Sequence, residues 1–168
     1  MSKVLDCINN RRSCRSFSQR NILSKIIKNI VNSAFKVPKS QADNFLHLFV
    51  LQNNKIIEDV FWFCQGMDSK PNLIIILGSH KKLIRENSYY PYLQMGCSLQ
   101  NILLTSYSYG VGSVPVGSAN LVGIKSYLNI NEEIDLKMLI SLGIPKNIQK
   151  ELTVDYSNFY SSNNINYY

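Results

Sequence analysis

The sequence predicts one globular domain that combines helices with a few strands, in an α+β or α/β arrangement. Two observations predict this class. Apolar residues repeat every three or four positions over several stretches, as on one face of a helix, and short apolar runs next to glycine or proline are typical of buried strands. The chain has 168 residues, of which 45% are hydrophobic and only 17% are charged, so it can bury a core and is not wholly disordered.

In the first half of the chain, Ser2 is placed to cap a short helix that runs to Asn10. A second helix begins at about Ile22, because apolar residues repeat at helical spacing from there, and Pro38 ends it. Three shorter elements are predicted next: a strand over Phe45–Leu51, a helix over Ile56–Phe63, and a central strand over Leu73–Leu77 bounded by Pro71 and Gly78.

In the second half, a long helix is predicted over Tyr92–Tyr109, and Gly110 supplies its C-terminal stop. An extended segment surrounds Pro115, and Ser118 is placed to cap a short helix that runs to Leu128. The last strand is predicted over Leu136–Leu142. Residues 1–150 are therefore expected to form a single domain, and residues 151–168 a C-terminal tail.

The formal net charge of +7 favours an anionic partner without identifying it. Nucleic acid is not expected, because the basic residues are scattered and do not alternate with aromatic residues as a stacking surface requires. The longest apolar run, Leu73–Leu77, is too short to cross a membrane, so a soluble cytoplasmic protein is expected. Four cysteines without a Cys-x-x-Cys pair, together with only two histidines, lead us to expect no metal site.

Three segments are candidates for a binding site. Arg11-Arg12-Ser13-x-Arg15 could hold a phosphate through guanidinium groups, a hydroxyl and turn amides, although a solvated basic turn has the same composition. Gly110–Gly117 either lets the backbone approach a flat ligand or forms an ordinary helix-to-strand turn. Gly143–Lys146 closes the last strand and offers a lysine. His47 and His80 give little support for a Ser-His-Asp or Cys-His site.

Taken together in this order, the segments resemble the nitroreductase family of flavin mononucleotide (FMN) enzymes. The resemblance extends from about Lys3 to Lys146. It rests on the Arg-Arg-Ser-x-Arg-x-Phe opening at Arg11–Phe17, on Gln100-Asn-Ile-Leu-Leu104 before Gly110-Val-Gly-Ser-Val-Pro-Val116, and on the closing Leu142-Gly-Ile-Pro145.

The resemblance implies a nitroreductase-like α+β fold, in which helices flank a central, mainly antiparallel sheet. It also implies an intertwined homodimer with two FMN sites between the subunits. Its site residues are carried over by position: Arg11, Arg12 and Ser13 match the residues that hold the phosphate and ribityl chain, Arg15 matches the cation beside the pyrimidine edge, and Pro115, Val116 and Gly117 match the partner-chain segment that crosses the flavin near N5.

Two parts of the family pattern are altered in this chain. The family stretch Pro-Ser-x-x-Asn-x-Gln-Pro falls on Pro38–Phe45, where Lys39, Ser40 and Asn44 are the residues that would contact the flavin. Lys146 or Lys150 would replace the basic residues that the family carries after the last strand. The region between Val50 and Pro71 is also shorter than in members with a helical lid, which implies a more open flavin face.

The resemblance further implies NAD(P)H as reductant and a nitroaromatic, a quinone or a similar small molecule as electron acceptor, in a ping-pong cycle. No catalytic side chain is expected, because the flavin carries the chemistry. Two alternatives stay open: a family relative with another flavin redox reaction, and a flavin-binding or flavin-sequestering protein of low turnover.

Overall fold

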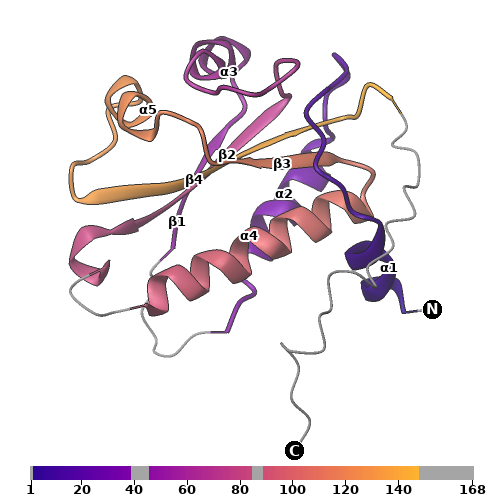
Figure 1. The fold of residues 1–168 in the computed structure, drawn as a ribbon, viewed down its shortest axis with the longest axis horizontal. Helices are drawn as coiled ribbons and strands as arrows, with labels where there is room; N and C mark the ends of the chain where they lie inside the picture. Colours follow the sequence, from indigo (N-terminus) through magenta and orange to yellow (C-terminus); the bar gives the residue numbers. More distant parts are fainter. Residues whose placement is uncertain (1, 39–45, 85–88, 148–168) are drawn as a thin grey trace, which may run out of the picture.

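The centre of the molecule is a four-stranded antiparallel sheet (Figure 1). The structure is a computed structural model that describes residues 2–38, 46–84 and 89–147. In sheet order β1-β2-β4-β3, every neighbouring pair is antiparallel. The strands are β1 (His47–Leu51), β2 (Leu73–His80), β3 (Gly112–Val116) and β4 (Ile134–Gly143). Because neighbouring strands are antiparallel, whereas α/β folds have a mostly parallel sheet, the fold belongs to the α+β class.

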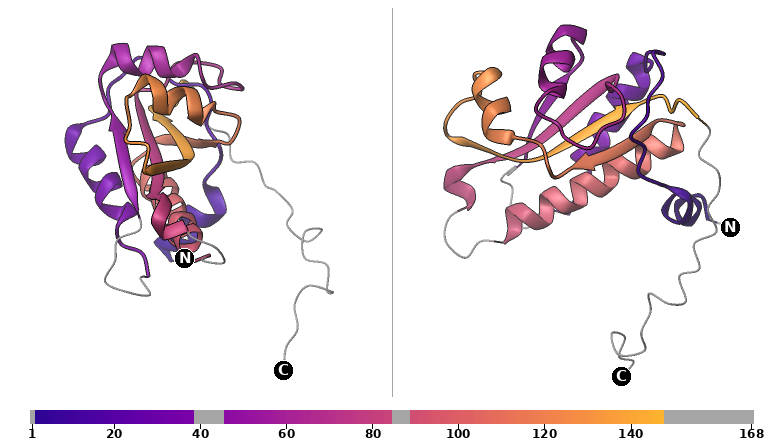
Figure 2. Two further views of the ribbon diagram at one scale, coloured as in Figure 1. Left: turned by 90° about the vertical axis from the view of Figure 1, so that its left-hand side faces the viewer. Right: turned by 45° about the horizontal axis from the view of Figure 1, so that its top comes forward.

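Helices cover both faces of this sheet (Figures 1 and 2). The helices α2 and α4 pack against each other on one face, while α3 and α5 lie on the other. The helices are α1 (Lys3–Asn10), α2 (Ser24–Ala34), α3 (Asn54–Phe61), α4 (Tyr90–Ser108) and α5 (Leu121–Tyr127), with a short 3₁₀ turn over Lys81–Ile84. None of the described helices combines the length and apolar composition that a membrane span requires.

Strand β2 is buried on both faces, which explains its unbroken apolar run. Leu73, Ile75 and Leu77 join the core beneath α2 and α4. Ile74 and Ile76 point the other way and join the core beneath α3 and α5. A strand that is covered on one face only would alternate apolar with polar residues, so the composition of β2 follows directly from its central position.

Two predicted helix caps are wrong. Ser2 precedes α1 but makes no capping hydrogen bond through its side chain. Helix α5 begins at Leu121, where the Asn120 side chain accepts from the Gly123 amide, whereas Ser118 donates to the carbonyl of Gln65. Ser118 therefore fixes a loop rather than a helix.

Other boundaries shift by smaller amounts. Helix α2 ends at Ala34, four residues before Pro38. Helix α3 begins two residues earlier than predicted, because the Asn53 side chain accepts hydrogen bonds from the amides of Lys55 and Ile56. Phe45, where the first strand was predicted to begin, lies outside the described residues.

Strand β2 continues past Gly78, where the sequence predicted its end. The register with β4 shifts between Leu77 and Gly78, and the strand runs on to His80. A Cβ atom at Gly78 would lie 2.9 Å from the backbone carbonyl oxygen of Asp135. The glycine therefore permits close approach of two strands at a bulge, and it does not end the strand.

We predict that Gly78→Ala destabilises the protein, because the obstructing atom belongs to the backbone of the neighbouring strand and cannot rotate away. The expected loss in the free energy of unfolding is about 1–3 kcal/mol, the usual range for overpacking. Urea unfolding followed by circular dichroism measures it.

Ser79→Ala is the matched control, since Ser79 is the next residue of the same strand. Its hydroxyl is buried without a hydrogen-bond partner among the described residues, so its removal should leave the unfolding free energy within about 0.5 kcal/mol of the parent. Equal unfolding midpoints for Gly78→Ala and the parent would contradict the close approach.

Candidate functional site

The segment from Arg11 to Ser18 lies between β3 and the chain that continues from β4. Ser13 forms a parallel bridge with Ser113, and Phe17 forms an antiparallel bridge with Pro145. The Cys14 amide donates to the Ser113 carbonyl at 3.1 Å, which fixes the same register. Three segments that are far apart in the sequence, and that were each candidates for a site, therefore meet at one edge of the sheet.

The other side of this segment is also held by hydrogen bonds. The Ser18 amide donates to the Ile144 carbonyl at 2.8 Å, and the Lys146 amide donates to the Ser16 carbonyl at 3.1 Å. The side chain of Asn72 adds two further bonds, donating to the Ser18 carbonyl and accepting from the Ile144 amide, each at 3.0 Å. Asn72 thus joins the segment to the chain that follows β4.

A pocket of about 340 Å³ opens beside the first residues of the segment. Its basic wall consists of Arg11, Arg12 and Arg20, and no carboxylate is among the described residues that line it. The remaining lining residues are Tyr107, Gly110, Val111, Gly112, Ser113, Ile144, Pro145 and Asn147. Three guanidinium groups without an acidic neighbour make this pocket suited to an anion.

The two leading arginines are held in different ways. The Arg12 Nη1 atom donates to the carbonyls of Asn9 at 2.6 Å and Arg11 at 2.9 Å, which fixes its guanidinium against the end of α1. The Arg11 Nη1 atom is buried and has no hydrogen-bond partner among the described residues. A buried donor on a charged group is costly to leave unpaired, so an anion that bonded to Arg11 would remove this penalty.

Glycines shape the opposite wall of this pocket. Gly110 follows α4 with a φ of 69°, a backbone conformation that side chains disfavour. At Gly112 a Cβ atom would lie 2.7 Å from the Cβ and Sγ atoms of Cys14 and 3.1 Å from the ring of Pro145. The glycine at position 112 is what allows β3 to pack against the Arg11–Ser18 segment.

A second, smaller pocket of about 190 Å³ contains Arg15. Pro115, Val116 and Gly117 line it, together with the loop Gln65–Met67. Ser118 donates to the Gln65 carbonyl at 3.0 Å and the Asp68 amide donates to the Arg15 carbonyl at 3.2 Å, so the loop is tied to both sides of the pocket. A Cβ atom at Gly117 would meet nothing within 4 Å.

The predicted site residues therefore fall into two groups on one edge of the sheet. Arg11 and Arg12 line the larger pocket, Ser13 is exposed next to it and pairs with Ser113 of its wall, and Arg15 lines the smaller pocket with residues 115–117. Lys146 is exposed and does not line the larger pocket, whereas Asn147 does. Lys39, Ser40 and Asn44, and the tail over 151–168, lie outside the described residues.

Sequence reasoning missed three contributors to this region. Arg20 carried a weak signal, since it is a basic residue five positions after Arg15. Asn72 and the Gln65–Met67 loop carried none, because polar residues in a connection between a helix and a strand are ordinary there. Their role follows only from the tertiary arrangement that places them against the Arg11–Ser18 segment.

The Cys14 thiol lies behind the basic segment and acts as a packing group. It is 5% exposed and donates to the Ser16 carbonyl with 3.4 Å between Sγ and the oxygen. Burial raises the pKa of the Cys14 thiol above its usual range, so it stays protonated at neutral pH and lacks the nucleophilic thiolate. Burial likewise raises the pKa of Cys64, to about 11.

The described residues contain no group of three His, Cys, Asp or Glu side chains placed to hold a metal ion.

A family model matches almost the whole of this chain. The family described as "Putative TM nitroreductase" matches residues 3–160. A curated protein of Archaeoglobus fulgidus, named "Putative NADH dehydrogenase/NAD(P)H nitroreductase", is 27% identical over 157 residues, which cover 87% of each chain. The range that the family model matches includes the Arg11–Ser18 segment, β3 and the continuation of β4, the three segments that meet at the candidate site.

Solved structures agree with the fold. A crystal structure from Parabacteroides distasonis, titled as a putative NADH dehydrogenase/NAD(P)H nitroreductase, superposes with a TM-score of 0.82 at 18% identity and covers 99% of this chain and 98% of its own. A crystal structure described as a putative nitroreductase from Desulfovibrio desulfuricans in complex with FMN superposes with a TM-score of 0.79 at 16% identity and covers 88% of each chain. At these identities the likeness shows the nitroreductase-like fold.

We predict that Asn72→Ala loosens the Arg11–Ser18 segment, because it leaves the Ser18 carbonyl and the Ile144 amide without their side-chain partner. The expected cost is about 1–3 kcal/mol in the free energy of unfolding, measured by urea titration.

Asn72→Asp distinguishes the contributions of the two hydrogen bonds, because its side chain can still accept from the Ile144 amide but can no longer donate to the Ser18 carbonyl. Its unfolding free energy should lie between those of the parent and Asn72→Ala. An alanine variant as stable as the parent would show that Asn72 does not hold the segment.

Proposed function

The chain belongs to the nitroreductase family described as "Putative TM nitroreductase", and from this premise we propose that it is an FMN-dependent oxidoreductase. It passes electrons from NAD(P)H to a nitroaromatic, a quinone or a similar small molecule. The name of the curated Archaeoglobus relative, putative NADH dehydrogenase/NAD(P)H nitroreductase, and the FMN complex of the Desulfovibrio neighbour support this proposal.

One observation carries the proposal: the buried, unpartnered Nη1 atom of Arg11 in a pocket without a carboxylate among its described lining residues. A phosphate group fits this pocket chemically, because its oxygens accept paired hydrogen bonds from a guanidinium. Arg12 adds a second positive charge, and the exposed Ser13 can contribute its hydroxyl and amide. These three residues would hold the FMN phosphate and the adjoining ribityl chain.

The smaller pocket suits the other end of the cofactor. Arg15 follows Arg11 by four residues, a separation of at most about 14 Å in an extended chain. A phosphate and a planar ring joined by a flexible chain could therefore contact both pockets along one short segment. Arg15 would lie beside the pyrimidine edge. Pro115, Val116 and Gly117, which the resemblance assigned to the partner chain, line the pocket of Arg15 within the same chain. We therefore propose that they face the ring of the flavin that Arg15 contacts, where Gly117 leaves room.

When bound, FMN supplies the chemistry of hydride and electron transfer. The residues of this chain bind the cofactor, orient it and adjust its reduction potential. Arg15 places a permanent positive charge where a reduced flavin carries negative charge, and this favours the reduced state. The larger pocket fixes the phosphate end through Arg11. We expect reductant and acceptor to use the same open face in turn, which is the ping-pong order.

The proposal includes a homodimer, and the apolar surface of α1 and α4 supports it. No residue of α1 is buried in the single chain, and Val4, Leu5 and Ile8 are 62%, 51% and 46% exposed. On α4, Leu93 is 55% exposed and Cys97 lies one helical turn further along the same face. Exposed apolar residues on two helices are typical of a surface that another subunit covers. Lys39, Ser40 and Asn44 remain the predicted contacts to the flavin of the partner subunit.

We predict that the purified protein binds FMN stoichiometrically and that Arg11→Ala weakens binding by about ten- to a hundredfold, the effect of losing one charge-assisted contact. Quenching of flavin fluorescence measures the dissociation constant. Lys25→Ala removes the same charge from an exposed position on α2, and it should bind FMN as the parent does.

A stopped-flow reaction with NADH or NADPH tests whether the protein is an oxidoreductase or a flavin-sequestering protein of low turnover. Bleaching of the bound flavin within seconds, followed by reoxidation with a quinone or nitroaromatic, is expected. A protein that ignores added FMN would refute the cofactor assignment, and a protein that binds FMN but does not bleach would refute the oxidoreductase.

We also predict that Leu93→Asp dissociates the dimer, because a carboxylate in the centre of an apolar interface would be desolvated without a partner. The dissociation constant should rise at least about a hundredfold, which sedimentation velocity detects.

Val122→Asp is the control, since Val122 is 82% exposed on α5, on the opposite face of the sheet. It should leave the dimer intact. A parent protein that is monomeric at micromolar concentration with FMN bound would contradict the dimer proposal.

A further inference from the structure

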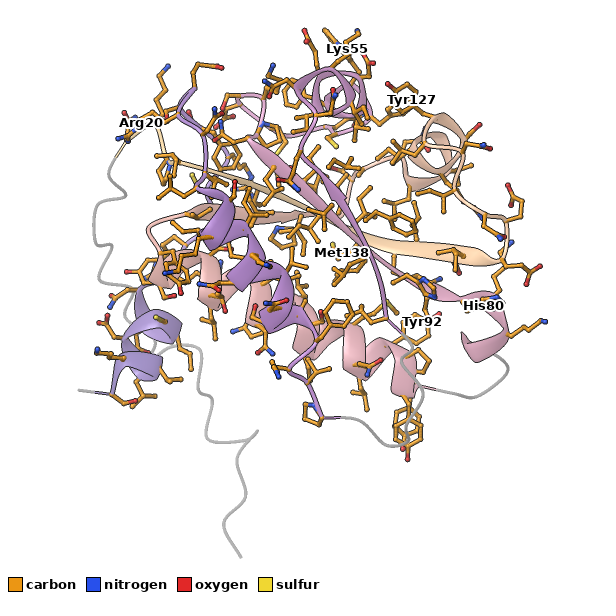
Figure 3. The ribbon with its side chains drawn as sticks, turned by 180° about the vertical axis from the view of Figure 1, so that it is seen from behind. Arg20, Lys55, His80, Tyr92, Tyr127 and Met138 are labelled. Carbon is orange, nitrogen blue, oxygen red and sulfur yellow. The ribbon has the colours of Figure 1, made fainter. Side chains whose placement is uncertain are left out.

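Arg20 is a third arginine in the larger pocket, outside the motif that carries the family resemblance. It lines the same pocket as Arg11 and Arg12, together with Asn147 from the chain that continues after β4. Figure 3 shows Arg20 at the edge of the molecule, near the point where the chain leaves the described part after β4. Its amide donates to the Ser18 hydroxyl at 3.4 Å, which connects it to the segment that Asn72 holds.

The guanidinium of Arg20 has no acidic partner in the described part of the chain, where the ion pairs involve lysines and a histidine only. Arg12, by comparison, directs Nη1 to two backbone carbonyls. Arg20 is therefore a cation on a pocket wall whose charge is not compensated by a neighbouring carboxylate. This is the state expected of a group that pairs with a bound anion.

Position also favours Arg20 over the lysine that follows the last strand. The backbone of Lys146 pairs with Ser16, and its exposed side chain does not line the pocket. A phosphate monoester presents three acceptor oxygens and nearly two negative charges at neutral pH, so it can accept hydrogen bonds from a further guanidinium besides that of Arg11. Arg20 is the further cation that the pocket wall provides.

We propose that Arg20 binds the phosphate of the cofactor and makes this pocket select phosphorylated flavin over riboflavin, an inference that rests on the proposed FMN function. Riboflavin has the same ring and ribityl chain as FMN and lacks only the phosphate. A residue that acts on the phosphate changes the affinity for FMN alone, whereas a residue that acts on the fold or the ring changes the affinity for both.

The test measures dissociation constants of the full chain for FMN and riboflavin by fluorescence quenching, for the parent and for Arg20→Gln. We expect the substitution to raise the FMN dissociation constant by about tenfold, because one charge-assisted contact is lost at a partly solvated site. The dissociation constant for riboflavin should stay within about twofold of the parent's value. Arg20→Lys keeps the charge and loses the paired donors, so it should fall between the parent and Arg20→Gln.

Two further variants sharpen the result. Lys25→Gln removes an equal charge from an exposed position on α2 and should change neither constant, which controls for the overall field of the protein. Lys146→Gln tests the competing assignment and should affect FMN less than Arg20→Gln does.

The inference is overturned if Arg20→Gln binds FMN as Lys25→Gln does, if it weakens FMN and riboflavin equally, or if Lys146→Gln alone removes the preference for FMN. These outcomes are distinct from failure of the proposed function, in which the parent protein itself binds no FMN.

Discussion

The candidate site depends on one contact, the insertion of the Arg11–Ser18 segment between β3 and the continuation of β4. Ser13 pairs with β3 in parallel, whereas Phe17 pairs antiparallel with Pro145 on the other side. Because both edges of the segment are bonded, neither its register nor its direction is free. That register assigns Arg11 and Arg12 to the larger pocket and Arg15 to the smaller one. Gly112 makes the insertion possible, since any side chain there would overlap Cys14.

The electrostatic character of the site comes from where the acidic residues lie, as much as from where the arginines lie. Lys55 pairs with Asp59 at 2.8 Å, and Lys125 pairs with Glu132 at 3.1 Å, both on the face of the sheet that carries α3 and α5. Such exposed pairs add little stability. These carboxylates lie away from the arginine pocket, whose described lining residues include no carboxylate to compete with a ligand.

Much of the fold follows from the sequence, because helical spacing and apolar runs report burial directly. The positions of α2, α4, β2 and β4 were predicted to within a few residues, and the antiparallel sheet that the resemblance implied is present. Helix caps were less predictable, since Ser118 and Asn120 both satisfy the local rule and only packing selects between them. Gly78 was misread for the same kind of reason: a glycine that admits a neighbouring strand looks, in sequence, like one that ends a strand.

The site was predictable only in part. The motif at Arg11–Arg15 and the segment at 115–117 could be recognised because each is contiguous. Their division between two pockets, and the contributions of Arg20 and Asn72, depend on contacts between distant parts of the chain that a local pattern does not encode. The insertion that creates these contacts joins residues about 100 positions apart, and closing so long a loop is entropically costly and slow. We therefore expect the basic segment to dock after the sheet has formed during folding, and to open locally in the native state before the core of the sheet does.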